Sequence, residues 1–273
     1  MAVLLADIGG THARFRWLKN GKIGSLFNYI CDDFNTPYAL IDQLMKDHSE
    51  EITGIILAGA GPVKNDSLRW TNRQDWLVSK KNLQKKYRIR NVLIINDVQA
   101  QGEGLTTLYK SGKTALLTAG TGLGGCFIIN NRVIPIEIGQ VKTEHGKIED
   151  LISGSGIVRL YHLFGGNKKI KSATLIDVLR LQKDKAAQKA YHTFYQKWGE
   201  ICGRLTTMLY AEKGICLWGN LIPKDEKDRK VLMMAYRKFL HKNLQKTPLH
   251  LVKDKTLAFK GLALLSVREF DQS

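Results

Sequence analysis

The stretch Asn91-Val92-Leu93-Ile94-Ile95-Asn96-Asp97 is the one around which the chain is organised. Residues 92–95 form a continuous apolar run of β-branched residues and leucine, which predicts a strand buried on both faces. The run ends in Asn96-Asp97, and a carboxylate at the carboxyl end of a buried strand lies where α/β folds place their chemistry. Two interpretations of Asp97 stay open at this point: a chemical role, or a cap for the helix that follows it.

The composition is ordinary for a globular protein. The 273 residues are 44% hydrophobic and 25% charged, enough for one large domain or two modest ones. No apolar run approaches about 18 residues, so we expect no membrane span. The amino-terminal residues lack the pattern of a secretion signal, which predicts a cytoplasmic protein. The four cysteines and seven histidines form no tight cluster, so a structural zinc is not expected.

The formal net charge of +17 raises the question of nucleic-acid binding. The basic residues are spread along the chain and are densest over residues 224–260, where they alternate with apolar residues at helical spacing. That pattern is typical of a solvated helix face, and no module of interleaved aromatic and basic residues is present. Specific nucleic-acid recognition is therefore not expected. Attraction of anionic substrates is the milder interpretation of the charge.

Two segments show the same succession of elements. Residues 4–30 read as a strand, a Gly-rich turn, a strand to Leu18, the hairpin turn Asn20-Gly21, and a third strand over 24–30. Residues 113–135 read as strand, Gly-rich turn, strand, Asn130-Asn131 turn and strand. The repeat predicts an α/β chain of two related halves with Asp97 at their junction.

We expect a small α/β domain over residues 1–95 and a large α/β domain over residues 96–256. The C-terminal helix, within 257–273, is expected to pack back on the small domain. Further helices are expected over 37–46, 79–87, 149–164, 174–181, 185–210 and about 225–242, and further strands over 54–58, 215–218 and 249–252. Ser79 is the expected N-cap of the helix over 79–87.

The two Gly-rich turns, Gly9-Gly10-Thr11 and Gly120-Thr121-Gly122, each join a strand to a strand. Glycines let backbone N–H groups converge, and converging N–H groups cradle phosphate oxygens. The alternative is a pair of tight hairpins that need glycine for steric reasons. Two turns in register, each with a threonine hydroxyl, favour phosphate binding. A strand rather than a helix follows Gly125, which excludes a Rossmann dinucleotide site.

Asp7 ends the first strand, directly before the first Gly-rich turn. A carboxylate beside a phosphate cradle commonly holds Mg²⁺ through water. A hydrogen-bonded turn aspartate fits the position equally well, so the sequence leaves both interpretations open.

Taken together, these motifs resemble the bacterial glucokinase family of the actin/hexokinase-like ATPase superfamily. The resemblance covers nearly the whole chain in the family order. Its segments are the phosphate motifs 7–14 and 119–124, the sugar-contacting segment 70–72, the catalytic segment 94–97, the loop and helix 152–161, and the adenosine motif 215–223.

The resemblance implies a two-domain actin/hexokinase-like (ribonuclease H-like) fold with a cleft between the domains. It also implies an ATP-dependent hexose kinase, with glucose as the expected sugar and a homodimer as the expected assembly. Asp97 would be the general base that accepts the proton of the sugar C6 hydroxyl as that oxygen attacks the γ-phosphate. The sugar would be held by Asn72, Asn96, Asp97, Glu137, Gln140 and Glu149. ATP would be held by Asp7, Ile8, Gly9, Gly10, Thr11, Gly120, Thr121, Gly122, Gly219 and Asn220, with Mg²⁺ near Asp7.

The chain departs from the family pattern in the expected sugar and adenosine segments. Glu137-Ile138-Gly139-Gln140 stands where the family reads Glu-Gly-Gly-His, the segment from Gln140 to Glu149 is short, and Asn220 replaces a glycine. These departures motivate an alternative, a non-catalytic sugar- or nucleotide-binding protein on the same fold. The retained Asp97 favours the kinase, because a pure binding protein does not need a base.

Overall fold

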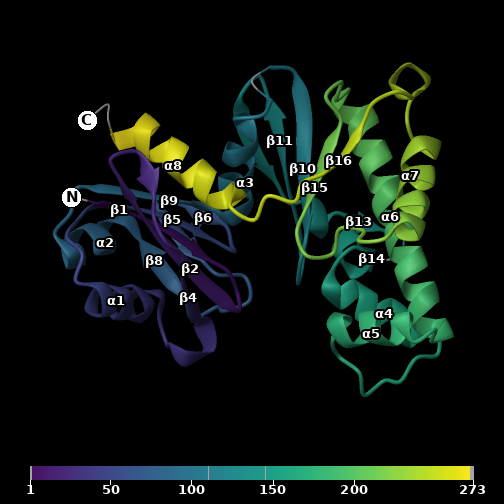
Figure 1. Cartoon of the computed structure of the whole chain (residues 1–273), viewed down its shortest axis with the longest axis horizontal. Helices are drawn as coiled ribbons and strands as arrows, with labels where there is room; N and C mark the ends of the chain where they lie inside the picture. The colour runs from purple at the N-terminus through teal and green to yellow at the C-terminus, as the bar shows by residue number, and fades with distance from the viewer. Residues whose placement is uncertain (1, 110, 145, 271–273) are drawn as a thin grey trace. The chain divides into compact units, whose positions relative to one another are not determined.

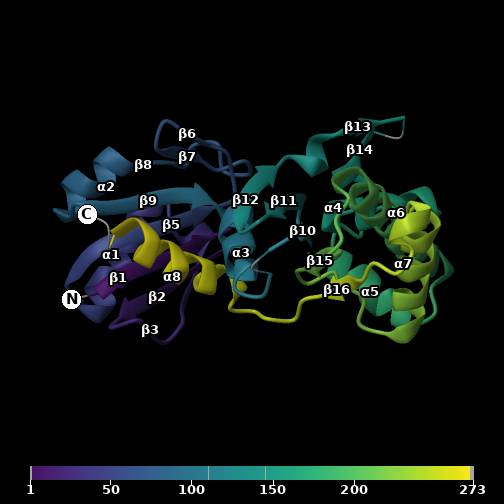
Figure 2. The same ribbon diagram turned by 90° about the horizontal axis from the view of Figure 1, so that it is seen from above.

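The computed structural model describes residues 2–109, 111–144 and 146–270, and the chain divides into two compact units (Figures 1 and 2). Unit 1 is Met1–Leu108 with Asp254–Ser273, and unit 2 is Tyr109–Lys253. The expected boundary after residue 95 differs from this division by one helix, α3 (Asp97–Thr106), which packs within unit 1 against the C-terminal helix α8 (Leu257–Phe270). Residues 271–273 of the expected C-terminal helix lie outside the described residues.

Unit 1 is built on a six-stranded sheet whose central strands are parallel. Its strands are β1 (Ala2–Ile8), β2 (His12–Lys19), β3 (Lys22–Ile23), β4 (Phe27–Ile30), β5 (Ile52–Gly59) and β9 (Asn91–Asn96). The order is β3-β2-β1-β5-β9, with β4 also paired to β2. The single strand expected over 24–30 is therefore wrong. The chain leaves the edge of β2 at Gly24, whose N–H donates to the Trp17 carbonyl at 2.8 Å, and rejoins it only at Phe27.

Helices cover both faces of this sheet (Figure 1). One face packs against α1 (Pro37–His48) and α2 (Lys80–Tyr87), and the other packs against α3 and α8. Along β9, Ile94 faces the first set of helices and Ile95 faces the second. Successive residues of a strand point to opposite faces, so a strand covered on both sides must be apolar throughout. This explains the unbroken apolar run at 92–95.

A small three-stranded sheet in unit 1 was not predicted from the sequence. Its strands are β6 (Val63–Lys64), β7 (Ser67–Arg69) and β8 (Leu77–Ser79), which are too short to show a periodicity. The loop from β7 to β8 packs Trp70 edge-to-face on Trp76, and the Trp70 indole N–H donates to the Ile8 carbonyl at 2.9 Å. The small sheet therefore holds residues 70–76 against the end of β1.

Unit 2 repeats the strand order of unit 1. Its strands are β10 (Lys113–Ala119), β11 (Leu123–Ile129), β12 (Arg132–Ile136), β15 (Ile215–Trp218) and β16 (Leu249–Leu251), in the order β12-β11-β10-β15-β16. When β4 is left out of the first sheet, both sheets have the order third, second, first, fourth and fifth strand, which agrees with the repeat predicted from the sequence. Both predicted hairpin turns have positive φ at their two central residues, 48° and 71° at Asn20-Gly21 and 48° and 67° at Asn130-Asn131. Such turns suit the right-handed twist of a hairpin.

The helices of unit 2 lie beside this sheet (Figure 2). Phe194 and Trp198 of the longest helix are buried in the core that the helices and the sheet share. These helices are α4 (Gly154–Leu163), α5 (Ala173–Leu181), α6 (Lys185–Leu209) and α7 (Glu226–Lys238), with the hairpin β13 (Lys142–Thr143) and β14 (Gly146–Lys147). The described part of the chain also contains short 3₁₀ helices, which are η1 (Cys31–Asp33) in unit 1 and η2 (Ile138–Gln140), η3 (Ile148–Asp150) and η4 (Lys242–Leu244) in unit 2.

Two helix boundaries in unit 2 were predicted wrongly. The helix expected from residue 149 begins at Gly154, because the Ser153 side chain caps it by accepting from the Gly156 N–H at 2.9 Å. The helix expected to reach residue 242 ends at Lys238. Within the described ranges, no helix combines the length and the apolar character needed to cross a membrane.

Candidate active site

The parallel strands of unit 1 end at one edge of the sheet. Ile8, Gly59 and Asn96 are register partners at the carboxyl ends of β1, β5 and β9. The first Gly-rich turn and the Asn96-Asp97 corner therefore leave the same end of the sheet on either side of β5, roughly 10 Å apart at ordinary strand spacing. This edge is where open α/β sheets bind ligands.

Neither the backbone conformation nor steric crowding requires glycine at the first turn. The turn is closed by the Gly9 N–H, which donates to the His12 carbonyl at 2.9 Å. Neither Gly9 nor Gly10 has a φ in the left-handed region. A Cβ would meet its nearest neighbour at 3.4 Å on Gly9 and at 3.9 Å on Gly10, which are ordinary contacts. The hairpin could therefore accept side chains here, and their absence leaves the backbone open to a ligand.

Asn72 lies beside the same turn. The atom nearest to a Cβ on Gly10 would be the Asn72 side-chain nitrogen, at 3.9 Å. The fold thus brings the predicted sugar-contacting residue Asn72 to the predicted phosphate turn, although 62 positions separate them in the sequence. The bond from Trp70 to the Ile8 carbonyl holds the two segments together.

Asp7 is nearly buried, with 8% of its surface exposed, at the end of β1. Burial raises the pKa of its carboxyl group above the ordinary value of 3.8, and the nearby Arg14 guanidinium opposes that rise. Arg14 lies opposite Asp7 in the β1–β2 register, with its Nη1 3.5 Å from Asp7 Oδ2. The sequence reasoning missed Arg14, although counting across the hairpin turn would have paired the two residues.

The cap of α3 is Asn96 rather than Asp97. Asn96 Oδ1 accepts from the N–H groups of Val98 at 2.9 Å and Gln99 at 3.3 Å, and its Nδ2 donates to the Gly61 carbonyl at 3.0 Å. The capping interpretation of Asp97 was therefore wrong. Asp97 is the first helical residue, and its Oδ1 shares the Val98 N–H at 2.9 Å. Asparagine and aspartate cap equally well, so the sequence did not distinguish them.

The second Gly-rich turn, in unit 2, packs against the start of α4. The Gly120 N–H donates to the Gly122 carbonyl at 2.9 Å, and the Gly154 N–H donates to the Gly120 carbonyl at 2.7 Å. Ser155 Oγ donates to the Thr121 carbonyl at 3.3 Å. A Cβ on Gly120 would meet nothing within 4 Å, and its φ is not left-handed. As in the first turn, the glycine leaves open backbone.

Gln140 and Glu149 are brought together beside this second turn. Gln140 Nε2 donates to Glu149 Oε1 at 2.6 Å, and Lys147 Nζ donates to Gln140 Oε1 at 2.6 Å. The other Glu149 oxygen would lie 3.2 Å from a Cβ on Gly122. Lys147 was missed from the sequence, because only the hairpin β13–β14 brings it to Gln140. Glu137 is exposed where η2 begins.

Gly219 needs to be glycine for conformational reasons. Its φ is +112°, and a Cβ would lie 2.8 Å from the Ala119 carbonyl oxygen. The parallel register pairs Thr118 with Trp218, so the second turn and Gly219 leave the sheet of unit 2 at the same edge. Asn220, which follows Gly219, is exposed.

Each unit therefore carries its own group of the residues predicted from the sequence. Unit 1 carries Asp7, Ile8, Gly9, Gly10, Thr11, Asn72, Asn96 and Asp97. Unit 2 carries Gly120, Thr121, Gly122, Glu137, Gln140, Glu149, Gly219 and Asn220.

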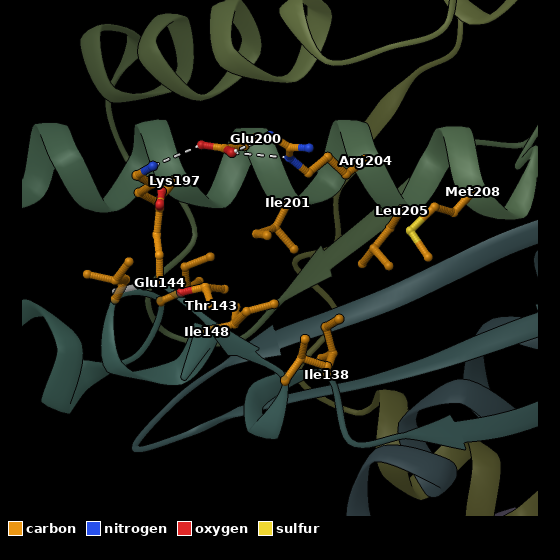
Figure 3. Close-up of a pocket in the computed structure, with 13 residues that line it drawn as sticks. Ile138, Thr143, Glu144, Ile148, Lys197, Glu200, Ile201, Arg204, Leu205 and Met208 are labelled. Carbon is orange, nitrogen blue, oxygen red and sulfur yellow. Dashed lines mark hydrogen bonds and ion pairs between the residues drawn. The ribbon is translucent and has the colours of Figure 1, made fainter. Parts of the chain in front are cut away.

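A separate cavity of about 580 Å³ lies in unit 2 between α6 and the segment from η2 to η3 (Figure 3). Ile138 and Ile148 line it from one side and Ile201, Leu205 and Met208 from α6. At its rim Glu200 pairs with Lys197 at 3.1 Å and with Arg204 at 2.9 Å, so these charges satisfy one another. Ile138 and Ile148 lie next to Gly139 and Glu149 in the sequence, but the described lining contains none of the predicted site residues.

Comparison with known proteins assigns the family. The model of the glucokinase family matches residues 4–141 and 134–268. The chain belongs to the glucokinase family. It is accordingly a sugar kinase, as the motifs of the two Gly-rich turns and the 94–97 segment predicted.

Individual relatives of this glucokinase-family chain are distant. It is 28% identical over 265 residues to a glucokinase of Rhizobium johnstonii, with 81% of this chain and 77% of the relative covered. It is 26% identical over 263 residues to a bifunctional protein of Paraburkholderia xenovorans, and the match spans 81% of this chain but only 41% of that relative.

The fold is also shared with solved structures. A ROK family glucokinase from Streptomyces griseus, in complex with glucose and AMPPNP, matches 97% of this chain and 99% of its own with a TM-score of 0.76. At 17% identity this likeness confirms the predicted two-domain actin/hexokinase-like fold.

Proposed function

We propose that this protein transfers the γ-phosphate of ATP to the C6 hydroxyl of a hexose, with glucose as the first candidate and Asp97 as general base. The observation that carries the proposal is the position of Asp97. Its carboxylate stands at the sheet edge that also bears the open Gly9-Gly10 turn, and Asn96 already caps α3. Asp97 is therefore not required as a cap and can accept a proton.

The two Gly-rich turns supply the phosphate contacts in this proposal. Backbone N–H groups at Gly9-Gly10-Thr11 and Gly120-Thr121-Gly122 would bind phosphate oxygens, with Ile8 beside the first turn and Gly219-Asn220 near the nucleotide. The absence of side chains at Gly9, Gly10 and Gly120 supports this assignment, because it leaves space beside each turn. The N–H groups of Gly9 and Gly120 themselves donate within their turns, so the phosphate donors would be the N–H groups of the neighbouring turn residues. Phosphoryl transfer needs little covalent help from the protein, so positioning and neutralisation of charge dominate the rate.

Amide and carboxylate side chains would supply the sugar contacts. Asn72 and Asn96 of unit 1, with Glu137, Gln140 and Glu149 of unit 2, carry the amide and carboxylate groups that bind hydroxyls in fixed directions. Asn96 would do so through its amide group, because its oxygen accepts from two backbone N–H groups. Asp97 would orient the C6 hydroxyl and remove its proton.

Asp7 fits one particular mode of magnesium binding. Among the described residues no group of three or more acidic, histidine or cysteine side chains could hold a metal ion by itself. Mg²⁺ in kinases is held instead by one or two carboxylates together with waters and substrate phosphates, and Asp7 at the first turn suits that role. Bound there, the ion would neutralise charge on the phosphates.

A specific observation keeps the non-catalytic alternative in view. Gln140 is hydrogen-bonded to both Glu149 and Lys147. Two polar groups assigned to the sugar thus bind one another, and a sugar would have to replace that bond. If this protein binds a sugar or a nucleotide without turnover, the competition between the sugar and the Gln140–Glu149 bond would explain it.

The deciding experiment is an assay of ADP release with Mg-ATP across a panel of glucose, mannose, galactose, fructose and N-acetylglucosamine. Turnover that depends on one of these sugars supports the kinase and names its acceptor. ADP and polyphosphate in place of ATP test the donor. Calorimetric binding of ATP or a hexose without turnover on any sugar would instead support the binding protein.

Location, assembly and nucleic-acid binding complete the proposal. Cys31, Cys202 and Cys216 are buried free thiols and Cys126 is also buried, which suits the reducing cytoplasm. The homodimer and the lack of specific nucleic-acid binding stay predictions, which sedimentation and elution from heparin at low salt would check.

Asp7→Asn is expected to raise the stability of unit 1 while lowering activity. Burial raises the pKa of Asp7, so the native state holds this proton more tightly than the unfolded state does. The stability contributed by the group is fully present below its ordinary pKa of 3.8 and is lost as the pH rises through the higher folded pKa. At pH 7 the ionised carboxylate therefore costs stability, and the neutral amide removes that cost.

Thermal unfolding at pH 7 and pH 4 tests this reasoning. The asparagine variant should unfold at a higher temperature than wild type at pH 7, and the difference should shrink toward pH 4. ADP release at low Mg²⁺ should fall in the same variant. A lower unfolding temperature at pH 7 would mean that the pairing with Arg14 outweighs the cost of burial.

A further inference from the structure

Arg73 follows Asn72 in the sequence, and three groups hold its guanidinium. Its Nε donates to the Gly10 carbonyl at 2.7 Å, and its Nη2 pairs with Asp32 of η1. The guanidinium carbon lies 4.7 Å from the ring centroid of Trp76. Only 19% of the side chain is exposed, whereas 74% of the Asp32 side chain is. A hydrogen bond, an ion pair and a stacked ring therefore fix one planar group.

The bond to Gly10 fixes more than one atom of the turn. A trans peptide is planar, and its C=O and N–H point in opposite directions. Once the Gly10 carbonyl accepts from Arg73, the N–H of Thr11 in the same peptide plane must point away from Arg73. Other bonds hold the turn on either side of this plane, because the Gly9 N–H donates to the His12 carbonyl and the Cys31 N–H donates to the Thr11 carbonyl, both at 2.9 Å. Glycine permits many backbone conformations, so the bond from Arg73 selects one orientation of the peptide between them.

The same arginine joins two segments that are distant in the sequence. Gly10 belongs to the first Gly-rich turn, and Arg73 belongs to the loop that carries Asn72, 63 positions further along. The stacking on Trp76 holds the other end of that loop. Arg73 therefore connects the loop that carries Asn72 directly to the turn.

We propose that Arg73 is a positioning residue that locks the Gly10–Thr11 peptide in its phosphate-binding orientation and couples it to Asn72. This inference rests on the proposed kinase function, and it adds a device that links sugar binding to nucleotide binding. Ordering of the loop by a sugar at Asn72 fixes the turn for the phosphates. Because coupling between two sites is reciprocal, ATP bound at the turn tightens the sugar by the same factor.

The test compares Arg73→Ala and Arg73→Lys with Arg69→Ala. Arg69 is the matched control, because it lies in β7 of the same small sheet and its Nη1 donates to the Gln74 carbonyl in the same loop, not to Gly10. Loss of a hydrogen bond from a charged donor changes an equilibrium constant by roughly 10- to 100-fold. We expect Arg73→Ala to lose about that factor in kcat/KM, with the KM values for ATP and for the hexose both raised.

Arg73→Lys should recover part of the loss, since lysine keeps the charge and one donor but not the planar fork. Arg69→Ala should stay within about threefold of wild type. The dissociation constant of the hexose should fall on adding AMPPNP in wild type but change little in Arg73→Ala. If the role of Arg73 is merely structural, Arg73→Ala should lower the unfolding temperature but keep the wild-type ratio of the hexose dissociation constants without and with AMPPNP.

The outcomes separate the two claims. If Arg73→Ala keeps wild-type KM values and the wild-type effect of AMPPNP, the inference fails while the proposed function stands. An equal loss in Arg69→Ala also overturns it, because general disturbance of the loop would then explain both variants. If wild type itself shows no hexose-dependent ADP release, or if Asp97→Asn leaves that release unchanged, the proposed function fails first.

Discussion

Asp97→Asn is expected to lower the turnover number with hexose and ATP by about 10²–10⁴-fold, the usual contribution of one positioned general base. The amide has the size and shape of the carboxylate but cannot accept the proton of the sugar hydroxyl. Binding of both substrates should persist, because the turns at Gly9-Gly10 and Gly120-Thr121 are untouched. The measurements are kcat from ADP release at saturating sugar, and dissociation constants by calorimetry.

The substitution should leave the fold intact. Asn96, not Asp97, caps α3 through bonds to the N–H groups of Val98 and Gln99. The lost negative charge in the first helical turn costs only about 0.3–1 kcal/mol of folding free energy. Gln99→Ala, two residues along the same helix, is the control and should retain nearly full activity. Turnover of the Asp97 variant within about threefold of wild type would show that this carboxylate is not the base.

Gly261→Val is expected to destabilise unit 1 strongly and to reduce activity with it. A Cβ on Gly261 would lie 1.9 Å from the Ala100 carbonyl oxygen and 2.7 Å from the Gly104 nitrogen. These are backbone atoms of α3, so no side chain can turn aside. On the other helix, a Cβ on Gly104 would lie 2.1 Å from the Leu257 carbonyl oxygen. α3 and α8 therefore cross with their backbones in contact.

Extra atoms in a packed core cost about 1–3 kcal/mol, and a clash between two backbones lies at or above the upper end. The valine variant should lose about 3 kcal/mol or more of the free energy of unfolding. Unfolding temperatures fall by about 2–4 °C for each kcal/mol in domains of 150–250 residues, so calorimetry resolves the loss. Because Asp97 is the first residue of α3, any displacement of this helix also moves the proposed base.

Val267→Ala is the matched control for this prediction. Val267 lies on α8 with 54% of its surface exposed, and substitutions at such sites stay within about 0.5 kcal/mol. Gly261→Ala should give an intermediate loss. An unfolding temperature of the valine variant equal to that of wild type would mean that α8 can move away from α3 without cost.

The local chemistry of the sequence determined most elements of secondary structure. The apolar runs, the Asn20-Gly21 and Asn130-Asn131 turns and the Ser79 cap depend on a few neighbouring residues, so they could be predicted. Ser79 Oγ accepts from the Asn82 N–H at 3.3 Å, as a cap should. The repeated succession of strand, Gly-rich turn, strand, Asn turn and strand was predicted from the same local signals, and the structure adds the strand order that the two sheets share.

Local chemistry was insufficient where two residues suited one role or where an element was very short. Asn96 and Asp97 are equally good caps, and only the bond from Asn96 to the Gly61 carbonyl distinguishes them. The three strands β6, β7 and β8 are two or three residues long. A strand is recognised by alternation over about four to eight residues, so these strands are too short to be recognised. The loop that joins β7 to β8 carries Trp70 and Trp76, whose rings pack edge-to-face, a contact that no local pattern of residues reveals.

The sequence by itself determined which residue types stand at the ends of the strands: two open Gly-rich turns and a carboxylate after a buried run. Only the tertiary structure decided their supporting contacts. It put α3 into unit 1 by packing it on α8, and it brought Arg73 to Gly10 and Lys147 to Gln140. Such pairs join residues whose distance in space depends on the whole fold, so neither spacing nor composition could reveal them.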